Sequence, residues 1–406
     1  MLPVISIGIS IAVILILLRY RAPIGLAMLA GCIISAVGGG LWGRPMLEVA
    51  GYTLSHPTTW ELALTIAFVS ALGRIMDRAG FLALLIDSLQ KLVRDTRHIM
   101  IAIPSLVGML MVPGGAIMSA PLVEEVGSRE NMTPVQMTLA NLMYRHVWYL
   151  IFPLFPSMIL AAQLAGINPG IIVLFNLPLA ALAFFITFFL IFRGRGRLEN
   201  SRYEGFNGSA LRSFLKAVSP MITAIVLALI LGIYFPLAIL AGVMLIFVYL
   251  WREEGYSLLS YLQLIFKSIN WPIFLAIFPI MYFKDVLDAG GGVEQVAIFF
   301  QEQGVPLPLL LVLVPFLGGF FTGSNTANIG ISFPLFLPMF PEENYMIYVA
   351  FIYLTSVVGY LISPIHLCLI LTREHFNCEI GILYRYFLIP SGAIMGAALL
   401  MFMILR

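Results

Sequence analysis

Long runs of apolar residues, separated by short polar segments and by glycine- and proline-rich breaks, dominate the chain. Many of these runs approach the ~20 residues that an α-helix needs to cross the hydrocarbon core of a bilayer. Membrane β-strands would instead appear as alternating segments of about ten residues. The pattern therefore predicts an all-α polytopic membrane protein.

Ten spans are expected, five in each half of the chain. The first five cover about 3–20, 23–42, 58–76, 133–164 and 169–192. The second five cover about 218–235, 237–251, 270–287, 343–371 and 383–405. Two amphipathic segments, about 79–95 and 292–302, have the pattern of helices that lie in the membrane interface.

Each half also contains a predicted re-entrant helical hairpin, about 98–127 in the first half and about 305–340 in the second. The second hairpin has small polar residues and glycine at its centre, from Gly318 to Asn328. Irregular backbone is tolerated at membrane depth only where protein or a water-filled cavity surrounds it. We therefore expect both tips to line a binding site.

The spans near 133–164 and 343–371 are predicted to be interrupted helices. Proline cannot donate a backbone hydrogen bond and clashes with the preceding turn of a helix. The first break is expected at Pro153-Leu154-Phe155-Pro156 and the second at Ser363-Pro364.

An internal repeat relates the two halves, because a shift of 211 residues aligns the chain with itself without a gap. Matched Trp, Asp and Pro at one register are hard to obtain by chance. The pairs include Trp60 with Trp271, Asp77 with Asp288, Pro104 with Pro315, and Tyr149 with Tyr360. We predict repeat one over 1–195, a basic cytoplasmic linker over 196–211 and repeat two over 212–406.

An odd number of spans per repeat makes the second copy enter the membrane from the opposite face, which is the inverted repeat of many secondary transporters. With both termini outside, most Lys and Arg residues fall in cytoplasmic loops, as the positive-inside rule requires. The predicted outer segments are instead acidic: Asp285, Asp288, Glu294, Glu302, Glu342 and Glu343. We expect a multi-pass protein of the cell (inner) membrane.

Composition narrows the function classes. The chain has 406 residues, of which 61% are hydrophobic and 10% charged, and a formal net charge of +2. It has no glycine-rich nucleotide-binding motif, and Cys32, Cys368 and Cys378 have no metal or redox spacing. We expect no cofactor, no nucleic-acid partner and no enzymatic activity, since no catalytic set appears at membrane depth.

The candidate site is where the hairpin tips meet the two breaks. Four helix N-termini that converge there would favour an anion, because each carries about half a positive charge and unpaired amides. Ser324, Asn325 and Thr326 can donate to a carboxylate or accept from a cation, although all three also cap helices well. Asn328 is a substrate ligand, a supporting residue or a packing residue.

Arg145 is the one Lys or Arg well inside a predicted span, ~18 Å along its helix at 1.5 Å per residue. It is a candidate counter-charge for an anionic substrate; a pair with Glu124 or Glu125, or snorkelling to the interface, are the alternatives. His366 follows the second break and is a candidate substrate contact. His146 is either a weak proton-relay candidate or a packing histidine.

No acidic side chain falls at mid-depth, where a proton antiporter usually carries one. This favours a sodium ion held by backbone carbonyls and hydroxyls, or protonation of the substrate or a histidine. The candidate cation-binding positions lie at the tips and breaks: Gly114, Gly115, Pro153, Gly323 and Ser363.

The tripeptide Ser324-Asn325-Thr326 resembles the signature of divalent anion–sodium symporters, within the ion-transporter superfamily that also holds citrate, gluconate and arsenite permeases. In detail the chain, with the segment from Val112 to Pro121, is most similar to an uncharacterised permease-like branch. The first tip, Pro113-Gly114-Gly115-Ala116, departs from the signature. The resemblance implies a homodimer in which hairpins and interrupted helices move as an elevator.

Two functions are therefore open. The first is a secondary active transporter, in the lipid bilayer, of a small anion coupled to sodium or protons. The second is a flippase for a lipid-linked substrate, or a membrane accessory subunit that transports nothing alone.

Overall fold

The computed structural model describes residues 2–110, 115–194, 203 and 207–406. Within these ranges most residues are helical and no β-strand occurs. The predicted all-α class is therefore confirmed.

The first half follows the predicted order with one addition. Its helices are α1 (Leu2–Arg19), α2 (Ile24–Gly38), α3 (Arg44–Ser55), α4 (Pro57–Arg78), α5 (Phe81–Leu92), α6 (Thr96–Met109), α7 (Gly115–Arg129), α8 (Pro134–His146), the 3-10 helix η1 (Val147–Leu150), α9 (Pro156–Ala165) and α10 (Pro169–Phe192). The added helix is α3, which the sequence analysis left as a connection. It is short and carries charge at Arg44 and Glu48, so it lacks the apolar run of a span.

The second half has the same order. Its helices are α11 (Gly208–Ile225), the π-helical η2 (Val226–Ile230), α12 (Phe235–Glu254), α13 (Leu258–Ser268), α14 (Trp271–Ala289), α15 (Gly292–Glu302), α16 (Leu307–Thr322), α17 (Asn325–Phe336), η3 (Leu337–Met339), α18 (Tyr345–Leu361), α19 (Leu367–His375) and α20 (Ile380–Leu405). Helix α13, the counterpart of α3, was not predicted from the sequence either. Residues 195–202 and 204–206 of the predicted linker lie outside the described residues, and α11 begins within its last part, at Gly208.

Helix starts recur at the register of the sequence repeat. Five pairs of helices begin 211 residues apart: α5 and α15 at 81 and 292, α6 and α16 at 96 and 307, α8 and α18 at 134 and 345, α9 and α19 at 156 and 367, and α10 and α20 at 169 and 380. The shift of 211 residues that matches side chains in the sequence therefore also matches the first residues of these helices.

Six described helices are long and apolar enough to cross a membrane, or up to eight if each of two bent helix pairs is counted as one span. The six are Leu2–Arg19, Pro57–Arg78, Pro169–Phe192, Gly208–Ile230, Phe235–Glu254 and Ile380–Leu405. Three shorter apolar helices, Ile24–Gly38, Pro156–Ala165 and Tyr345–Leu361, accompany them. The arrangement is that of a polytopic membrane protein, and ten spans stay a prediction.

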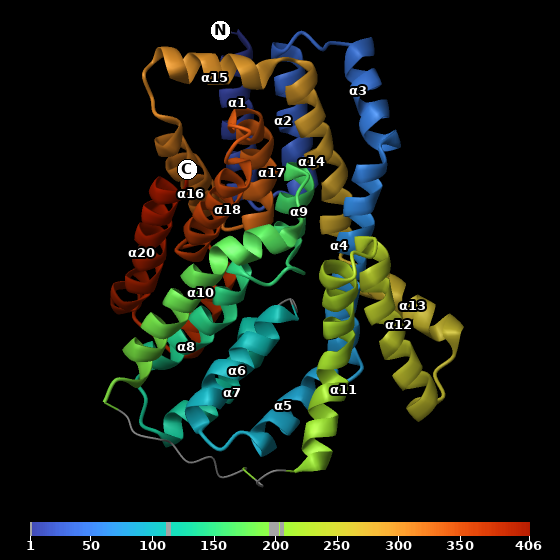
Figure 1. Cartoon of the computed structure of the whole chain (residues 1–406), viewed down its shortest axis with the longest axis vertical. Helices are drawn as coiled ribbons and strands as arrows, with labels where there is room; N and C mark the ends of the chain where they lie inside the picture. Colours follow the sequence, from blue (N-terminus) through green and yellow to red (C-terminus); the bar gives the residue numbers. More distant parts are fainter. Residues whose placement is uncertain (1, 111–114, 195–202, 204–206) are drawn as a thin grey trace.

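The two halves are interleaved. In Figure 1, α5 lies at the lower end of the molecule and its counterpart α15 at the upper end. Helix α5 packs on α11 from the second half, and α15 packs on α1 from the first. The second helix of each hairpin also packs on the other half of the chain: α7 contacts α19, and α17 contacts α9.

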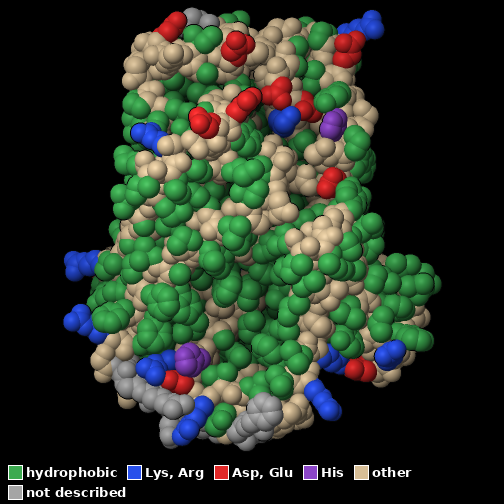
Figure 2. Space-filling model, viewed as in Figure 1, with side chains coloured by type: hydrophobic (Ala, Val, Ile, Leu, Met, Phe, Trp, Pro, Cys, Tyr) green, Lys and Arg blue, Asp and Glu red, His purple; other side chains and the backbone are tan. Residues whose placement is uncertain are grey.

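Charge is distributed unequally over the visible face. Figure 2 shows a broad apolar middle, acidic side chains mainly toward the upper end, and most Lys and Arg side chains in the lower half. Glu294 and Glu302 lie on α15 at the upper end, whereas Lys91 ends α5 at the lower end. Lipid-facing surfaces of membrane proteins are apolar, so this middle band is the expected bilayer contact.

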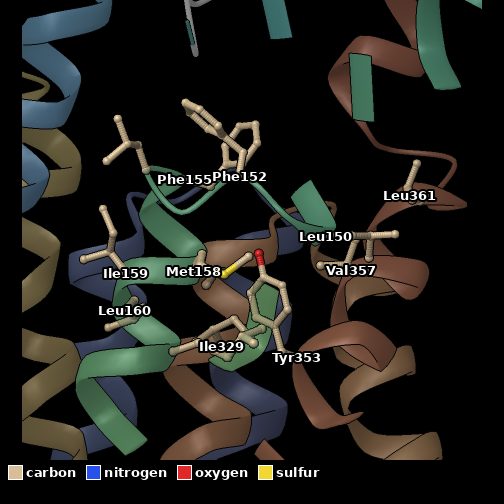
Figure 3. Close-up of a cluster of buried hydrophobic side chains, with 14 of the residues drawn as sticks. Leu150, Phe152, Phe155, Met158, Ile159, Leu160, Ile329, Tyr353, Val357 and Leu361 are labelled. Carbon is tan, nitrogen blue, oxygen red and sulfur yellow. The ribbon is translucent and has the colours of Figure 1, made fainter. Parts of the chain in front are cut away.

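A buried cluster joins the halves beneath the first break. Figure 3 shows Phe155 and Met158, from the break and α9, beside Ile329 of α17 and Tyr353 of α18. All four are fully or almost fully buried. The Tyr353 hydroxyl donates to the Tyr149 carbonyl oxygen at 2.7 Å. The break is therefore held in place by the second half.

The first interruption begins earlier than predicted. Helix α8 ends at His146 and is followed directly by the 3-10 helix η1. The irregular stretch therefore runs from 151 to 155 rather than from Pro153 to Pro156. Pro156 is instead the first residue of α9. Proline is well tolerated there, because the N–H of the first helical residue has no partner within the helix. The second interruption, between Leu361 and Leu367, falls where it was predicted.

Candidate functional site

The second hairpin tip turns on a single glycine. Helix α16 ends at Thr322, and Gly323 has a left-handed φ of 58°. A Cβ at Gly323 would lie 2.9 Å from Ile365 Cγ1, in the second break. Glycine is therefore required both by the backbone conformation and by the close contact between tip and break.

Ser324 and Ser363 serve this turn structurally. The Ser324 hydroxyl accepts from Ala327 N at 3.4 Å and caps α17, which is the alternative role expected for it. The Ser363 hydroxyl donates to the Phe320 carbonyl oxygen at 2.6 Å and accepts from Ile365 N at 3.4 Å. Ser363 thus ties the break to the first arm of the hairpin.

A buried polar chain supports the same tip from α18. The Ser356 hydroxyl donates to Asn325 Oδ1 at 2.7 Å and accepts from Asn328 Nδ2 at 2.6 Å. Asn328 Nδ2 also donates to the Pro315 carbonyl oxygen at 2.6 Å, and its Oδ1 accepts from Ser332 at 3.1 Å. The Asn328 amide is consequently occupied by protein groups, whereas Asn325 Nδ2 is buried and has no partner.

In the first half, Arg145 occupies the position 211 residues before Ser356. The helix packing is the same in both halves, since a Cβ on Gly108 would lie 2.5 Å from the Arg145 carbonyl oxygen and one on Gly319 2.6 Å from that of Ser356. Only the first half places a charge there. The guanidinium lies against the start of α7, where a Cβ on Gly115 would stand 2.6 Å from both terminal nitrogens.

Arg145 is a buried cation without a described counter-charge. The residue is 6% exposed, and its Nη1 is buried with no hydrogen-bond partner. Glu124 lies 2.8 Å from His375 Nε2, and Glu125 lies 2.9 Å from Arg129. The pairing of Arg145 with Glu124 or Glu125 is therefore wrong.

Arg145 is one of the residues that line a cavity of about 300 Å³. Its lining joins both halves and contains polar groups from α8, η1, α9, α17, α18 and the second break: Arg145, Tyr149, Ser157, Thr326, Tyr360 and His366. Gly323 also lines it, so the second tip reaches the cavity. Buried polar groups without partners are few in native proteins, and here Arg145 and Ser157 each have one such atom and His366 has two.

Two helix N-termini open at this cavity. Helix α9 begins at Pro156 and α19 at Leu367, and both residues line it. Neither start has a side-chain cap, because Phe155 and His366 make no capping hydrogen bond. Uncapped N-termini leave amide N–H groups and positive partial charge directed at the cavity.

His366 and Cys368 line the cavity, and His146 lies directly behind His366. The His146 and His366 rings meet edge to face, 4.6 Å between centroids, and His366 also contacts Tyr360 at 4.2 Å. His146 Nδ1 hydrogen bonds the Leu142 carbonyl oxygen at 2.7 Å. Cys368 lines the cavity, and one nitrogen of each histidine and its sulfur lie within 4.8 Å of one another.

The other candidate cation positions are scattered. Gly114 lies outside the described residues, and Gly115 packs on a guanidinium. Pro153 is buried in the first break but is not part of the cavity lining. The structure therefore brings Arg145, Thr326, His366 and Gly323 together around the cavity and leaves Asn328, Ser363 and Pro153 behind its walls.

Six polar lining residues were not predicted from the sequence: Ser70, Arg74, Tyr149, Ser157, Asn270 and Tyr360. Arg74 also donates to the Ile269 carbonyl oxygen at 3.3 Å. Tyr149 and Tyr360 were quoted as repeat partners, and their position just before each break was the signal that could have found them.

The fold defines a polytopic helical membrane protein, with a cavity between its two halves that is lined by polar and apolar residues. Residues 2–405 match a family described as "Protein of unknown function (DUF401)", and the chain belongs to that family. No curated protein sequence matches the chain. The ion-transporter superfamily stays a prediction.

A solved structure has a similar fold. It is described as "Crystal structure of the Alcanivorax borkumensis YdaH transporter reveals an unusual topology". The two chains are 15% identical, the match covers 90% of this chain and 89% of that chain, and the TM-score is 0.64. At this identity the likeness concerns the fold alone.

Proposed function

We propose that this protein is a secondary active transporter of a small anionic substrate. The observation that carries the proposal is the buried guanidinium of Arg145, which has no described counter-charge and belongs to a residue that lines a cavity of about 300 Å³. A buried charge costs several kcal/mol unless it is paired. An anion that enters the cavity would supply the missing partner, and a guanidinium is suited to bidentate binding of a carboxylate or an oxyanion.

The surrounding groups favour the same ligand. The uncapped starts of α9 and α19 direct positive partial charge at the cavity. Thr326 and Ser157 contribute hydroxyl groups to the lining, and His366 contributes an imidazole with no partner on either nitrogen. In this proposal Ser324 and Asn328 shape the tip, while Asn325 holds its free amide group close to the site.

We propose that the ion whose gradient drives transport binds at the second hairpin tip. A sodium ion beside Gly115 would meet the Arg145 guanidinium, so that position disfavours a cation. The second tip has no such charge, and carbonyl oxygens around Gly323 are the better candidates. Protons are the alternative coupling ion, with His366 at the cavity and His146 directly behind it.

We further infer ten spans in two inverted repeats, with both termini outside the inner membrane. The recurrence of helix starts at 211 residues supports two copies. The placement of α5 and α15 at opposite ends of the molecule supports inversion (Figure 1). The basic lower half and acidic upper end support a cytoplasmic lower end (Figure 2).

Elevator movement in a homodimer follows from the superfamily resemblance and belongs to the proposal. The Alcanivorax borkumensis protein of similar fold is called a transporter in its description, which favours transport over a purely accessory role. A flippase for lipid-linked substrates would need a lipid-accessible groove, whereas the cavity here carries Arg145, Thr326 and His366.

The experiment is a thermal-shift screen of mono- and dicarboxylates and inorganic oxyanions on the purified protein, with and without sodium. A ligand that binds the folded state raises its melting temperature. We expect at least one anion to raise it and to be taken up by proteoliposomes under a sodium or proton gradient. Stabilisation by neutral lipid-linked substrates alone, with no response to any anion, would favour the flippase.

A further inference from the structure

We infer that His146, His366 and Cys368 form a binding site for a soft monovalent metal ion, Cu⁺ or its redox-inert substitute Ag⁺. The two imidazoles and the thiol offer one ligand atom each, all within 4.8 Å of one another. This is the one such trio of His, Cys, Asp or Glu found among the described residues. The inference does not rest on anion transport, because a chain that moves no anion could still bind the metal here.

The hydrogen bond of His146 prepares the ring as a ligand. Its Nδ1 donates to the Leu142 carbonyl oxygen at 2.7 Å, since a carbonyl can only accept. The Nε2 atom must then carry the lone pair, and it is buried without a partner. Metal-binding histidines typically donate their other ring N–H to a backbone carbonyl in this way.

An anion in the cavity would not satisfy this lone pair. Anions and the Nε2 atom are both acceptors, so they cannot hydrogen bond to one another. His366 likewise keeps at least one lone pair when neutral, and neither of its nitrogens has a partner. A metal ion held by nitrogen and sulfur meets the needs of both rings at once.

The ligand set and the local charge select the metal. Thiolate with imidazole suits Cu⁺ and Zn²⁺ among the biological ions. Binding replaces the proton of the Cys368 thiol by the metal, the proton leaves to solvent, and the thiolate neutralises one positive charge. A divalent ion would keep a net positive charge beside Arg145, which lines the same cavity. A monovalent ion leaves the site neutral.

The three ligand atoms need to move only slightly closer together to bind one ion. A trigonal ion with bonds of about 2.1 Å holds its ligand atoms about 3.6 Å apart. The trio lies within 4.8 Å, and side-chain rotation of Cys368, which is half-buried and lines the cavity, can shorten that separation. The same exposure gives the ion a path to the sulfur.

The test measures Cu⁺ retained by the full-length purified protein against a chromogenic Cu⁺ chelator under reducing conditions. We expect a single tightly held Cu⁺ per chain, with one sulfur and two imidazole nitrogens in its X-ray absorption spectrum. Cys368→Ser should weaken binding by at least about 100-fold, since loss of a direct ligand exceeds the loss of an outer-shell partner. Cys32→Ser and Cys378→Ser are matched controls and should retain the ion.

Several results would overturn the site. Wild-type protein that releases all its Cu⁺ to the chelator has no such site. Equal binding by Cys368→Ser, or loss on changing Cys32 or Cys378, places the ion elsewhere. The chain has 20 methionines, and a wild-type spectrum with sulfur ligands alone would assign the ion to them. That last measurement decides the question even if the Cys368 variant fails to fold.

Discussion

The guanidinium of Arg145 occupies the space that a side chain at Gly115 would fill: a Cβ there would lie 2.6 Å from both Nη1 and Nη2. The start of α7 and the end of α8 are thus fitted to one another around a charge. In the second half, Ser356 stands at the matching position and holds a tip by hydrogen bonds instead. The two halves therefore pack alike at this position but differ in charge, because only the first half carries a cation there.

Arg145→Met is expected to raise the stability of the ligand-free protein. A buried cation without a partner is a cost to the fold, and methionine fills a similar volume without charge. We expect a gain of at least about 1 kcal/mol, in line with replacements of buried charges by apolar residues. Thermal unfolding in detergent without added anions measures it. A clear fall in melting temperature would mean that Arg145 is a structural residue.

Gly115→Ala should weaken anion binding and leave the fold intact. The new methyl group would lie 2.6 Å from the Arg145 terminal nitrogens and 2.9 Å from Val107 Cγ1, so the flexible Arg145 side chain must leave its position and Val107 must shift slightly. We expect about a tenfold loss of affinity, or ~1.4 kcal/mol. Gly51→Ala on α3, where a Cβ meets nothing within 4 Å, is the control and should bind normally. Normal affinity in both variants would show that the position of the guanidinium is unimportant.

Ser356→Ala should destabilise the second tip. The change removes the group that donates to Asn325 Oδ1 and accepts from Asn328 Nδ2. Leaving buried amide groups without partners costs about 1–3 kcal/mol. Thermal unfolding compares it with Ser391→Ala, whose equally buried hydroxyl bonds only the Phe387 carbonyl oxygen of its own helix. Equal losses in the two variants would mean that the chain of hydrogen bonds adds nothing.

The proposed inversion of the second repeat predicts which positions are accessible from each face of the membrane. Lys91 and Glu302 are equivalent positions 211 residues apart, at the ends of α5 and α15. Single cysteines introduced there, in a background with Cys32, Cys368 and Cys378 replaced by serine, should be labelled from opposite faces by a membrane-impermeant maleimide. We expect Glu302→Cys to react from outside and Lys91→Cys only after permeabilisation. Labelling of both from one face would show that the repeats run in parallel.

The periodic parts of the fold could be predicted from the sequence, because apolar runs and proline breaks are local signals. The recurrence of Trp60 at Trp271 and of Pro104 at Pro315 gave the register that helix starts follow. Helices α3 and α13 were missed because their short amphipathic sequences resemble connections. The first break was predicted too late, since Pro153 acts on the turn before it and not at its own position.

The site was only partly predictable. Arg145 could be found because a charge inside a span is conspicuous, and Thr326 because small polar residues stand out at a tip. The local sequence does not show that the Ser363 hydroxyl donates to the Phe320 carbonyl oxygen. Nor does it show that the Asn328 amide donates to the Pro315 carbonyl oxygen and to Ser356. The cluster of His146, His366 and Cys368 depends on two helices that are far apart in sequence, so no spacing rule detects it.

The most direct test of the anion site is calorimetric titration of the best anion from the thermal-shift screen into wild-type protein and Arg145→Gln. Glutamine keeps hydrogen-bonding capacity but removes the charge that the cavity directs at its ligand. We predict at least a tenfold loss of affinity, with Arg74→Gln at the cavity edge losing less. Equal affinity in wild-type protein and Arg145→Gln would contradict the account, because the buried guanidinium would then not bind the anion.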